Sequence, residues 1–132
     1  MIGILVVSHN RKIAEGVCEL AAEMTQGKVP LIPVGGTAGG ESGTDVTAIV
    51  DALNTLLGQV DEVLVLGDLG SAFLGVRTAL EFIAPEQAQR VVVSHAPLVE
   101  GAVIAAVEAA VGRSARDAES AAQQALTVTK SF

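Results

Sequence analysis

The chain has 132 residues, half of them hydrophobic, and its 8 basic and 15 acidic residues give a formal net charge of −7. This length suits one domain with one core, which we expect over residues 1–132. The acidic balance and the absence of any basic run exclude a typical nucleic-acid-binding protein.

The first half of the chain alternates between strand and helix patterns. The apolar run 2–7 is short, β-branched and uncharged, which predicts a buried strand. Helical spacing then predicts an apolar helix face formed by Ile13, Val17, Leu20 and Met24. Residues 29–34 predict a second strand at a sheet edge, because its two prolines cannot donate to a ladder. A glycine-rich loop over 35–43 precedes a second helix marked by Val46, Ile49, Val50, Leu53, Leu56 and Leu57.

The second half continues the alternation. Residues 63–66 and 91–93 predict a third and a fourth strand. The third helix has an apolar face of Phe73, Val76, Leu80 and Ile83, with Pro85 just past its end. The fourth helix has Val99, Val103, Val107 and Val111. Ser114 opens a capping box for a fifth helix, and residues 127–129 allow a short extra strand at the C-terminal end.

Strands joined by helices of this length imply parallel pairing with right-handed crossovers. We therefore predict an α/β fold, an open doubly wound sheet of four parallel strands in the order 2-1-3-4 with helices on both faces. The carboxyl ends of parallel strands share one rim, which brings together His9, the 35–44 loop, Asp68 and His95. The topological switch, where ligands bind in such folds, lies between the strands that end in His9 and Asp68.

His9 is the candidate nucleophile at this rim. A carboxylate such as Asp68 can fix the tautomer of an imidazole and leave the other ring nitrogen free to attack phosphorus. Backbone N–H groups, glycines and hydroxyls offer phosphate contacts at Asn10, Arg11, Gly39, Gly40, Ser42, Thr44 and Ser71. Two plainer readings stay open, since His9 can be an inert strand-end residue and Asp68 can cap the third helix.

Several motifs are absent from the sequence. There is no Walker motif, no zinc-ligand spacing and no Gly-x-Ser-x-Gly elbow. Phosphoryl carriage on a histidine needs no resident metal, nucleotide or other cofactor, so we expect none. Cys18 is the only cysteine, which we interpret as a small core residue in a reduced, cytoplasmic setting. No run of about 20 apolar residues predicts a membrane span, and the N-terminal residues lack a signal peptide's basic region.

Several segments of the chain resemble the DhaM family, the phosphocarrier subunits of dihydroxyacetone kinases that depend on the phosphotransferase system (PTS). As they stand here, these segments are residues 3–9, 14–17, 35–36, 43–44, 65–72 and 96–102. The resemblance covers almost the whole chain. A Ser-His pair alone is a weak signal, but its combination with Asp-Leu-Gly-Ser-Ala and Pro-Leu-Val-Glu-Gly-Ala is specific.

The resemblance implies a single domain like the IIA domains of the mannose-type PTS, and a homodimer. It implies that His9 takes a phosphoryl group from phospho-HPr on Nε2 and passes it to ADP held on the DhaL subunit. The ATP so formed would phosphorylate dihydroxyacetone bound to DhaK. The chain would then be a phosphotransferase subunit, with Asp68 as the family's carboxylate near the active histidine. Some DhaM chains carry HPr-like and enzyme I-like domains as well, whereas we expect only the IIA-like unit here.

The chain departs from the family pattern at three places. Asn10 stands where Ser is common, Asp45 stands where Ser is common, and residues 73–77 replace a continuation that usually contains Met and Asn. None of these departures removes the nucleophile. Asp45 adds negative charge near a phosphate site, so a role for it in binding phosphate is not expected.

His95 stands in a sequence context that copies that of His9, since both histidines follow Val-Val-Ser. The family pattern gives the phosphoryl group to His9, so we expect a rim or packing role for His95. Three alternatives to the kinase subunit stay open. One is a mannose-type sugar-uptake IIA domain, and another is a small tetrapyrrole metal chelatase in which His95 would be a second ligand or base. The third is a dimeric binding module without catalysis.

Overall fold

The structure is a computed structural model that describes residues 1–130, and its strands and helices alternate along most of the chain. The elements are β1 (Ile2–Ser8), α1 (Arg11–Thr25), β2 (Leu31–Gly35), α2 (Val46–Leu57), β3 (Glu62–Gly67), α3 (Gly70–Leu80), α4 (Pro85–Ala88), β4 (Val91–Val93), α5 (Leu98–Ala110), α6 (Ala115–Gln123) and the 3₁₀ helix η1 (Gln124–Leu126). Within residues 1–130, no helix is both long and apolar enough to cross a bilayer.

The four strands form one parallel sheet in the order β2-β1-β3-β4, which confirms the predicted topology. β1 lies between β2 and β3, and every residue of β1 is buried. β2 lies at an edge with Pro33 exposed, as the prolines of this segment predicted. Because all strands run in one direction, the residues that follow β1 and β3 meet at the same rim of the sheet.

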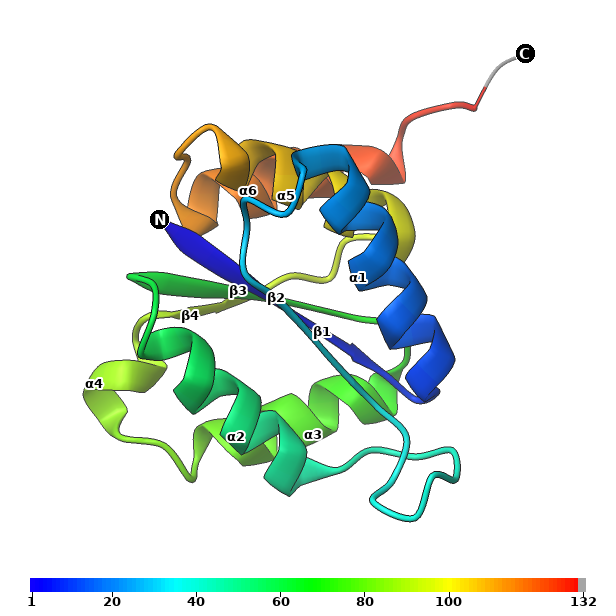
Figure 1. The fold of residues 1–132 in the computed structure, drawn as a ribbon, viewed down its shortest axis with the longest axis vertical. Coiled ribbons are helices and arrows are strands. Elements are labelled where there is room, and N and C mark those ends of the chain that lie inside the picture. The colour runs from blue at the N-terminus through cyan, green and yellow to red at the C-terminus, as the bar shows by residue number, and fades with distance from the viewer. Residues whose placement is uncertain (131–132) are drawn as a thin grey trace.

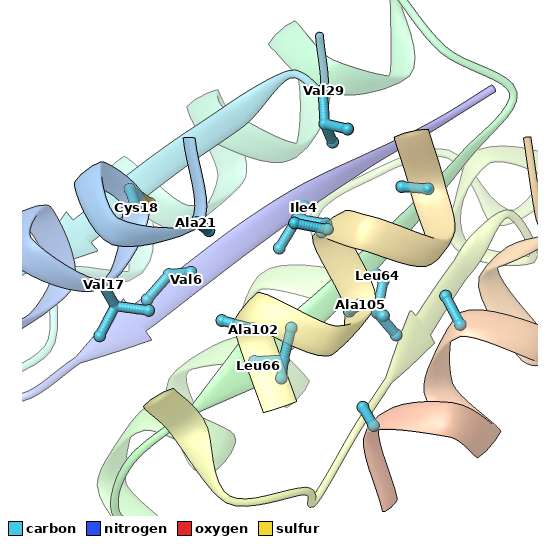
Figure 2. Close-up of a cluster of buried hydrophobic side chains, with 14 of the residues drawn as sticks. Ile4, Val6, Val17, Cys18, Ala21, Val29, Leu64, Leu66, Ala102 and Ala105 are labelled. Atoms are coloured by element: carbon cyan, nitrogen blue, oxygen red, sulfur yellow. The ribbon is translucent and has the colours of Figure 1, made fainter. Parts of the chain in front are cut away.

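Different helices cover the two faces of the sheet. α1, α5 and α6 lie on one face, and α2 and α3 lie on the other (Figure 1). Side chains alternate between the faces along each strand, so both faces are apolar. Figure 2 shows the first face, where Val17 of α1 lies beside Val6 of β1, and Ala105 of α5 lies beside Leu64 of β3. The second face has larger aliphatic helix residues, including Ile49, Leu53 and Leu56 of α2.

The buried face of α1 differs from the predicted one. Val17 is buried as predicted, but Ile13 and Met24 are 47% and 55% exposed. The residues that face the sheet are Ala14, Val17, Cys18, Ala21 and Thr25. The helix is therefore rotated so that small side chains face the sheet, which lets α1 approach it closely.

α5 shows the same effect more strongly. Its predicted core stripe is turned outward, since Val99, Val107 and Val111 are 45%, 44% and 68% exposed. The buried residues of α5 are Gly101, Ala102, Ala105, Ala106 and Ala109. A side chain at Gly101 would come within 3.1 Å of Leu66 Cδ2, so this helix packs too close to the sheet for valines on its inner face.

The last third of the chain corrects two details and confirms one. α3 ends at Leu80, so Ile83 lies beyond the helix although it is buried, and Pro85 opens the short helix α4. The Ser114 hydroxyl caps α6 by accepting a hydrogen bond from Asp117 N at 3.1 Å, as predicted. Residues 127–129 form no strand within the described chain, because this segment leads away from the sheet (Figure 1).

Candidate functional site

Asp68 ties the end of β3 to the end of β1. Its carboxylate accepts a hydrogen bond of 2.6 Å from the hydroxyl of Ser8, which is fully buried. It also accepts from the backbone N–H of His9 at 3.2 Å and from that of Leu69 at 2.7 Å. Three donors on one carboxylate fix the main chain on both sides of the rim. Ser8 has a second role, because its oxygen accepts from Asn10 N at 3.0 Å.

The contact between Asp68 and His9 differs in kind from the one expected from the sequence. We expected the carboxylate to bind a ring nitrogen, whereas it binds the main chain of His9. Among the described residues, no hydrogen bond joins the imidazole to Asp68. Asp68 thus places His9 through its backbone and leaves both ring nitrogens without a carboxylate partner.

The two ring nitrogens of His9 have different surroundings. Nδ1 is buried and has no hydrogen-bond partner within residues 1–130. Nε2 makes no hydrogen bond in the same residues and is not buried, so it is the nitrogen that solvent reaches. The ring as a whole is half-buried. A partner protein can therefore reach His9 through Nε2 alone.

The start of α1 lies directly beside His9. Asn10 caps this helix, because its side-chain oxygen accepts from Lys12 N at 2.9 Å and from Ile13 N at 3.2 Å. Arg11 and Lys12 are exposed, so the first turn of α1, which closely follows His9 in the chain, carries two cations. A hollow of about 300 Å³ opens here, and it is lined by Asn10, Arg11, Lys12, Gly40, Glu41 and Ser42.

This hollow brings together four of the predicted phosphate contacts, namely Asn10, Arg11, Gly40 and Ser42. The loop that supplies Gly40 and Ser42 lies at the end of the sheet where α1 begins (Figure 1). It is held there by a hydrogen bond of 2.9 Å from Gly43 N to His9 O. Gly43 has a φ of +143°, which few other residues adopt, so the glycine is needed for this connection.

The remaining predicted contacts do not line this hollow. Gly39 is exposed in the same loop, and Ser71 is exposed in the first turn of α3. Thr44 Oγ1 is buried without a partner in the described residues, and the methyl group of Thr44 lies against Gly75 of α3. Asp45, the acidic departure, caps α2 by accepting from Ala48 N at 3.1 Å. Its charge is thus directed at a helix N-terminus, which it stabilises.

His95 follows β4 on the same rim and is exposed. Its ring packs against Phe73 of α3, with ring centroids 4.7 Å apart. Sequence reasoning missed this pair and the buried hydrogen bond of Ser8. A serine directly before the candidate nucleophile, at the end of a buried strand, was the one available signal for Ser8, because a buried hydroxyl needs a partner.

Cys18 is not a candidate nucleophile. It is buried against the sheet, as predicted, and burial raises the pKa of its thiol to about 12. The thiol therefore stays protonated and inert near neutral pH. Within residues 1–130, no three His, Cys, Asp or Glu side chains are grouped closely enough to hold a metal ion.

Comparisons with known proteins agree with this geometry. Residues 3–119 match the EIIA-man family, described as the PTS system fructose IIA component. The chain is 40% identical over 114 residues to the phosphoryl donor subunit DhaM of PEP-dependent dihydroxyacetone kinase 2 from Listeria innocua, covering 86% of this chain and 90% of that protein. It is 38% identical over 129 residues to DhaM of Providencia stuartii, covering 96% of this chain but only 27% of that longer protein.

A solved structure is similar over nearly the whole fold. The crystal structure of the protein of unknown function EF1359 superposes with a TM-score of 0.81 at 32% identity, covering 92% of each chain. A sigma-54 interaction domain protein from Enterococcus faecalis is 19% identical with a TM-score of 0.71, which shows a shared fold only. From the match over residues 3–119 and the identity to a protein of nearly equal length, the chain belongs to the EIIA-man family of PTS IIA components and, within it, to the DhaM subunits.

Proposed function

We propose that this chain is the phosphohistidine carrier of a PTS-dependent dihydroxyacetone kinase and that it works in the cytoplasm. His9 accepts a phosphoryl group from phospho-HPr and passes it to ADP held on a DhaL subunit. The ATP formed there phosphorylates dihydroxyacetone bound to a DhaK subunit. The DhaM relatives, which are phosphoryl donor subunits of such kinases, support this assignment over a chelatase or a binding module without catalysis.

The observation that carries the proposal is the state of the His9 ring. Its main chain is fixed by Asp68, its Nδ1 is buried while Nε2 is not, and the exposed cations Arg11 and Lys12 open the helix that closely follows it in the chain. An accessible, neutral imidazole nitrogen is a good nucleophile near pH 7. Because His9 is pre-positioned, little ordering is left for the moment of transfer.

Nε2 of His9 is the nucleophile in the first step of the transfer and the leaving group in the second. The Nε2 lone pair attacks the phosphorus of the donor's phosphohistidine, a new P–N bond forms, and the donor's P–N bond breaks with its electron pair returning to the donor imidazole. In the second step a terminal phosphate oxygen of ADP attacks the same phosphorus. The P–N bond on His9 breaks, and its electron pair returns to Nε2. No oxidant, metal ligand or nucleotide on this chain is needed for either step.

The groups around His9 suit a bound phosphoryl group. Spread negative charge on the transferred group calls for positive charge and hydrogen-bond donors close by. Arg11, Asn10, Gly40 and Ser42 line the adjacent hollow, and we assign the phosphoryl oxygens to this side first. Gly39, Thr44 and Ser71 surround the same rim and are the further contacts of the proposal.

A direct test measures phosphoryl uptake. The purified chain is incubated with phosphoenolpyruvate, enzyme I and HPr, and the acid-labile gain of one phosphoryl mass is followed by mass spectrometry. We expect stoichiometric uptake in the wild type and none in His9→Ala. A wild type that takes up no phosphoryl group would contradict the proposal.

A second stage identifies the acceptor. DhaL with ADP, DhaK and dihydroxyacetone are added to the phosphorylated chain, and loss of the phosphohistidine is compared with formation of dihydroxyacetone phosphate. Equal and rapid changes in both are expected. A phosphorylated chain that is discharged only by a membrane sugar permease of the mannose type would instead indicate the sugar-uptake function.

We also propose that the chain forms a homodimer. α1 and α5 carry exposed apolar residues, among them Ile13, Met24, Val99 and Val107. A hollow of about 390 Å³ between α1, α5 and the C-terminal segment is lined by Leu20, Val99, Val103 and Ile104. Exposed apolar residues of this kind are typical of a surface that a partner covers. Sedimentation equilibrium should give a dimer for the wild type and a monomer for Val107→Glu, whereas Phe82→Glu, at a 70% exposed residue beyond α3, should stay dimeric.

A further inference from the structure

A second hollow lies beside the His9 rim, between α3 and β4. It has a volume of about 230 Å³ and is lined by Phe73, Val76, Arg77, Leu80, Val93 and His95. We call it the α3–β4 hollow. Its lining combines an aromatic ring and aliphatic side chains with a guanidinium and an imidazole, so it offers both apolar and hydrogen-bonding contacts.

Phe73, which lines the α3–β4 hollow, links it to the segment that holds His9. The Phe73 ring packs over Gly67, where an added Cβ would lie 3.2 Å from Phe73 Cζ. Gly67 directly precedes Asp68, whose carboxylate holds the backbone of His9. On its other side, the Phe73 ring contacts His95. A protein that docks over His9 and extends along α3 would cover this hollow as well.

Arg77 is the main charge in the hollow and is not used by the fold. Within residues 1–130 it makes no ion pair and no side-chain hydrogen bond, and it is exposed. Arg11, Lys12, Lys28 and Arg116 are also unpaired among the described residues, but only Arg77 of these cations lines the α3–β4 hollow. In a chain with a net charge of −7, an unpaired guanidinium over an aromatic-lined hollow is a local site for an anionic group.

We propose that the α3–β4 hollow receives a carboxylate side chain from the protein that exchanges phosphoryl groups with His9. The hollow is too apolar for a free inorganic ion alone, but it fits an aspartate or glutamate whose stem lies on Phe73 and Leu80 and whose head pairs with Arg77. Leu69 and Leu74, 55% and 61% exposed, extend the apolar contact toward a protein surface. This inference rests on the proposed function, because it assumes that a protein docks over His9.

The test compares two charge reversals of equal size. Arg77→Glu changes the hollow, and Lys28→Glu makes the same change in the exposed turn after α1, away from the rim. Phosphoryl transfer from phospho-HPr and transfer to DhaL with ADP are measured separately. For the protein that uses the hollow, we expect Arg77→Glu to raise KM about tenfold with little change in kcat, and Lys28→Glu to leave both near the wild-type values.

Three further measurements keep the result specific. The neutral variant Arg77→Gln should raise KM about threefold, and high salt should shrink the difference between wild type and Arg77→Glu. Phosphorylation of His9 by the small donor phosphoramidate should be the same in all variants, because that donor needs no docking. Equal KM values for Arg77→Glu and Lys28→Glu with both proteins, or a loss of phosphoramidate labelling in Arg77→Glu, would overturn the proposal.

A binding experiment separates this inference from the proposed function. Unphosphorylated HPr and DhaL are titrated into His9→Ala protein with and without Arg77→Glu, so no phosphoryl transfer is involved. Weaker binding with Arg77→Glu supports the docking site even if His9 takes up no phosphoryl group. Normal phosphoryl uptake combined with binding that ignores Arg77 overturns the docking site and leaves the carrier function in place.

Discussion

The tetrapeptide Val-Val-Ser-His occurs twice in this chain, at the end of β1 and at the end of β4. The two copies share their local backbone geometry but differ in the residues that surround them. In both, the serine is fully buried and its oxygen accepts a backbone hydrogen bond from the residue two places later, at 3.0 Å for Ser8 and 3.1 Å for Ser94. Only Ser8 also binds a carboxylate, that of Asp68. Both copies thus form the same turn, but only the copy that contains His9 is a candidate active site.

The difference arises from strand order. β1 lies inside the sheet beside β3, so its end meets Asp68, whereas β4 lies at the edge and its end meets the face of α3. His9 is half-buried with one ring nitrogen exposed, and His95 is an exposed ring against Phe73. A short motif acquires its chemistry from neighbours that are distant in sequence, and the topological switch point supplies them here.

The largest expected difference between the two copies is in phosphoryl uptake. His9→Ala should abolish the acid-labile phosphorylation by phospho-HPr, whereas His95→Ala should be labelled fully. The reason is that, of the two histidines, only His9 has its backbone held by a carboxylate within residues 1–130. Mass spectrometry of both variants after the same incubation gives the answer, and labelling lost only in His95→Ala would reverse the assignment.

Asp68→Asn should make the end of β1 resemble the end of β4, where no carboxylate of the described chain holds the histidine backbone. The amide side chain places an NH₂ group near the donors of Ser8 and His9, so the turn that holds the nucleophile loosens. Misplacing a reacting group by about 1 Å can cost about 100-fold in rate, so we expect the transfer rate to fall by up to about 100-fold. The initial rate of labelling by phospho-HPr measures the effect. Asp51→Asn, at an exposed residue of α2, removes the same charge and should keep the wild-type rate.

The two serines should differ in their contribution to stability. Ser8→Ala removes a hydrogen bond to a charged group and leaves Asp68 with one donor fewer, so we expect a loss of about 2 kcal/mol in the free energy of unfolding. Ser94→Ala removes one backbone contact and should cost about 1 kcal/mol. Urea unfolding of both variants tests the order, and equal losses would mean that the bond from Ser8 to Asp68 adds little.

Sequence patterns were sufficient for the strands and their order. The uncharged, β-branched runs predict buried strands, and the helices that connect them predict that these strands pair in parallel. The same logic brought His9, Asp68 and the glycine-rich loop to one rim. Chain order and strand direction carry this information, so no side-chain detail was needed.

Helix faces were harder to predict than strands. In α5 the valines recur every four residues and predict a core stripe, yet Ala102, Ala105 and Ala109 are the residues that face the sheet. Hydrophobicity alone ranks valine above alanine, but the short distance between α5 and the sheet favours the smaller side chain. The predicted hydrogen bond between Asp68 and a ring nitrogen of His9 was wrong for a similar reason. The sequence predicts that these two residues lie close together, but it does not predict which of their atoms form the hydrogen bond.

The smallest effect concerns the start of the helix that follows each histidine copy. Asn10 caps α1 through two backbone N–H groups, whereas α5 begins after Pro97 without a side-chain cap. Asn10→Ala should therefore lower the free energy of unfolding by about 1 kcal/mol, as loss of a helix cap does. Thermal and urea unfolding measure this loss.

Asn10→Asp separates capping from phosphate contact. Aspartate caps a helix as well as asparagine, so this variant should keep the wild-type stability. Its added negative charge, at the residue directly after His9, should instead slow labelling of His9 several-fold by repelling the incoming phosphoryl group. If Asn10→Ala slows labelling as much as Asn10→Asp does, the amide itself holds the phosphoryl group. If only the aspartate slows it, the role of Asn10 is to begin the helix and leave the approach to His9 uncharged.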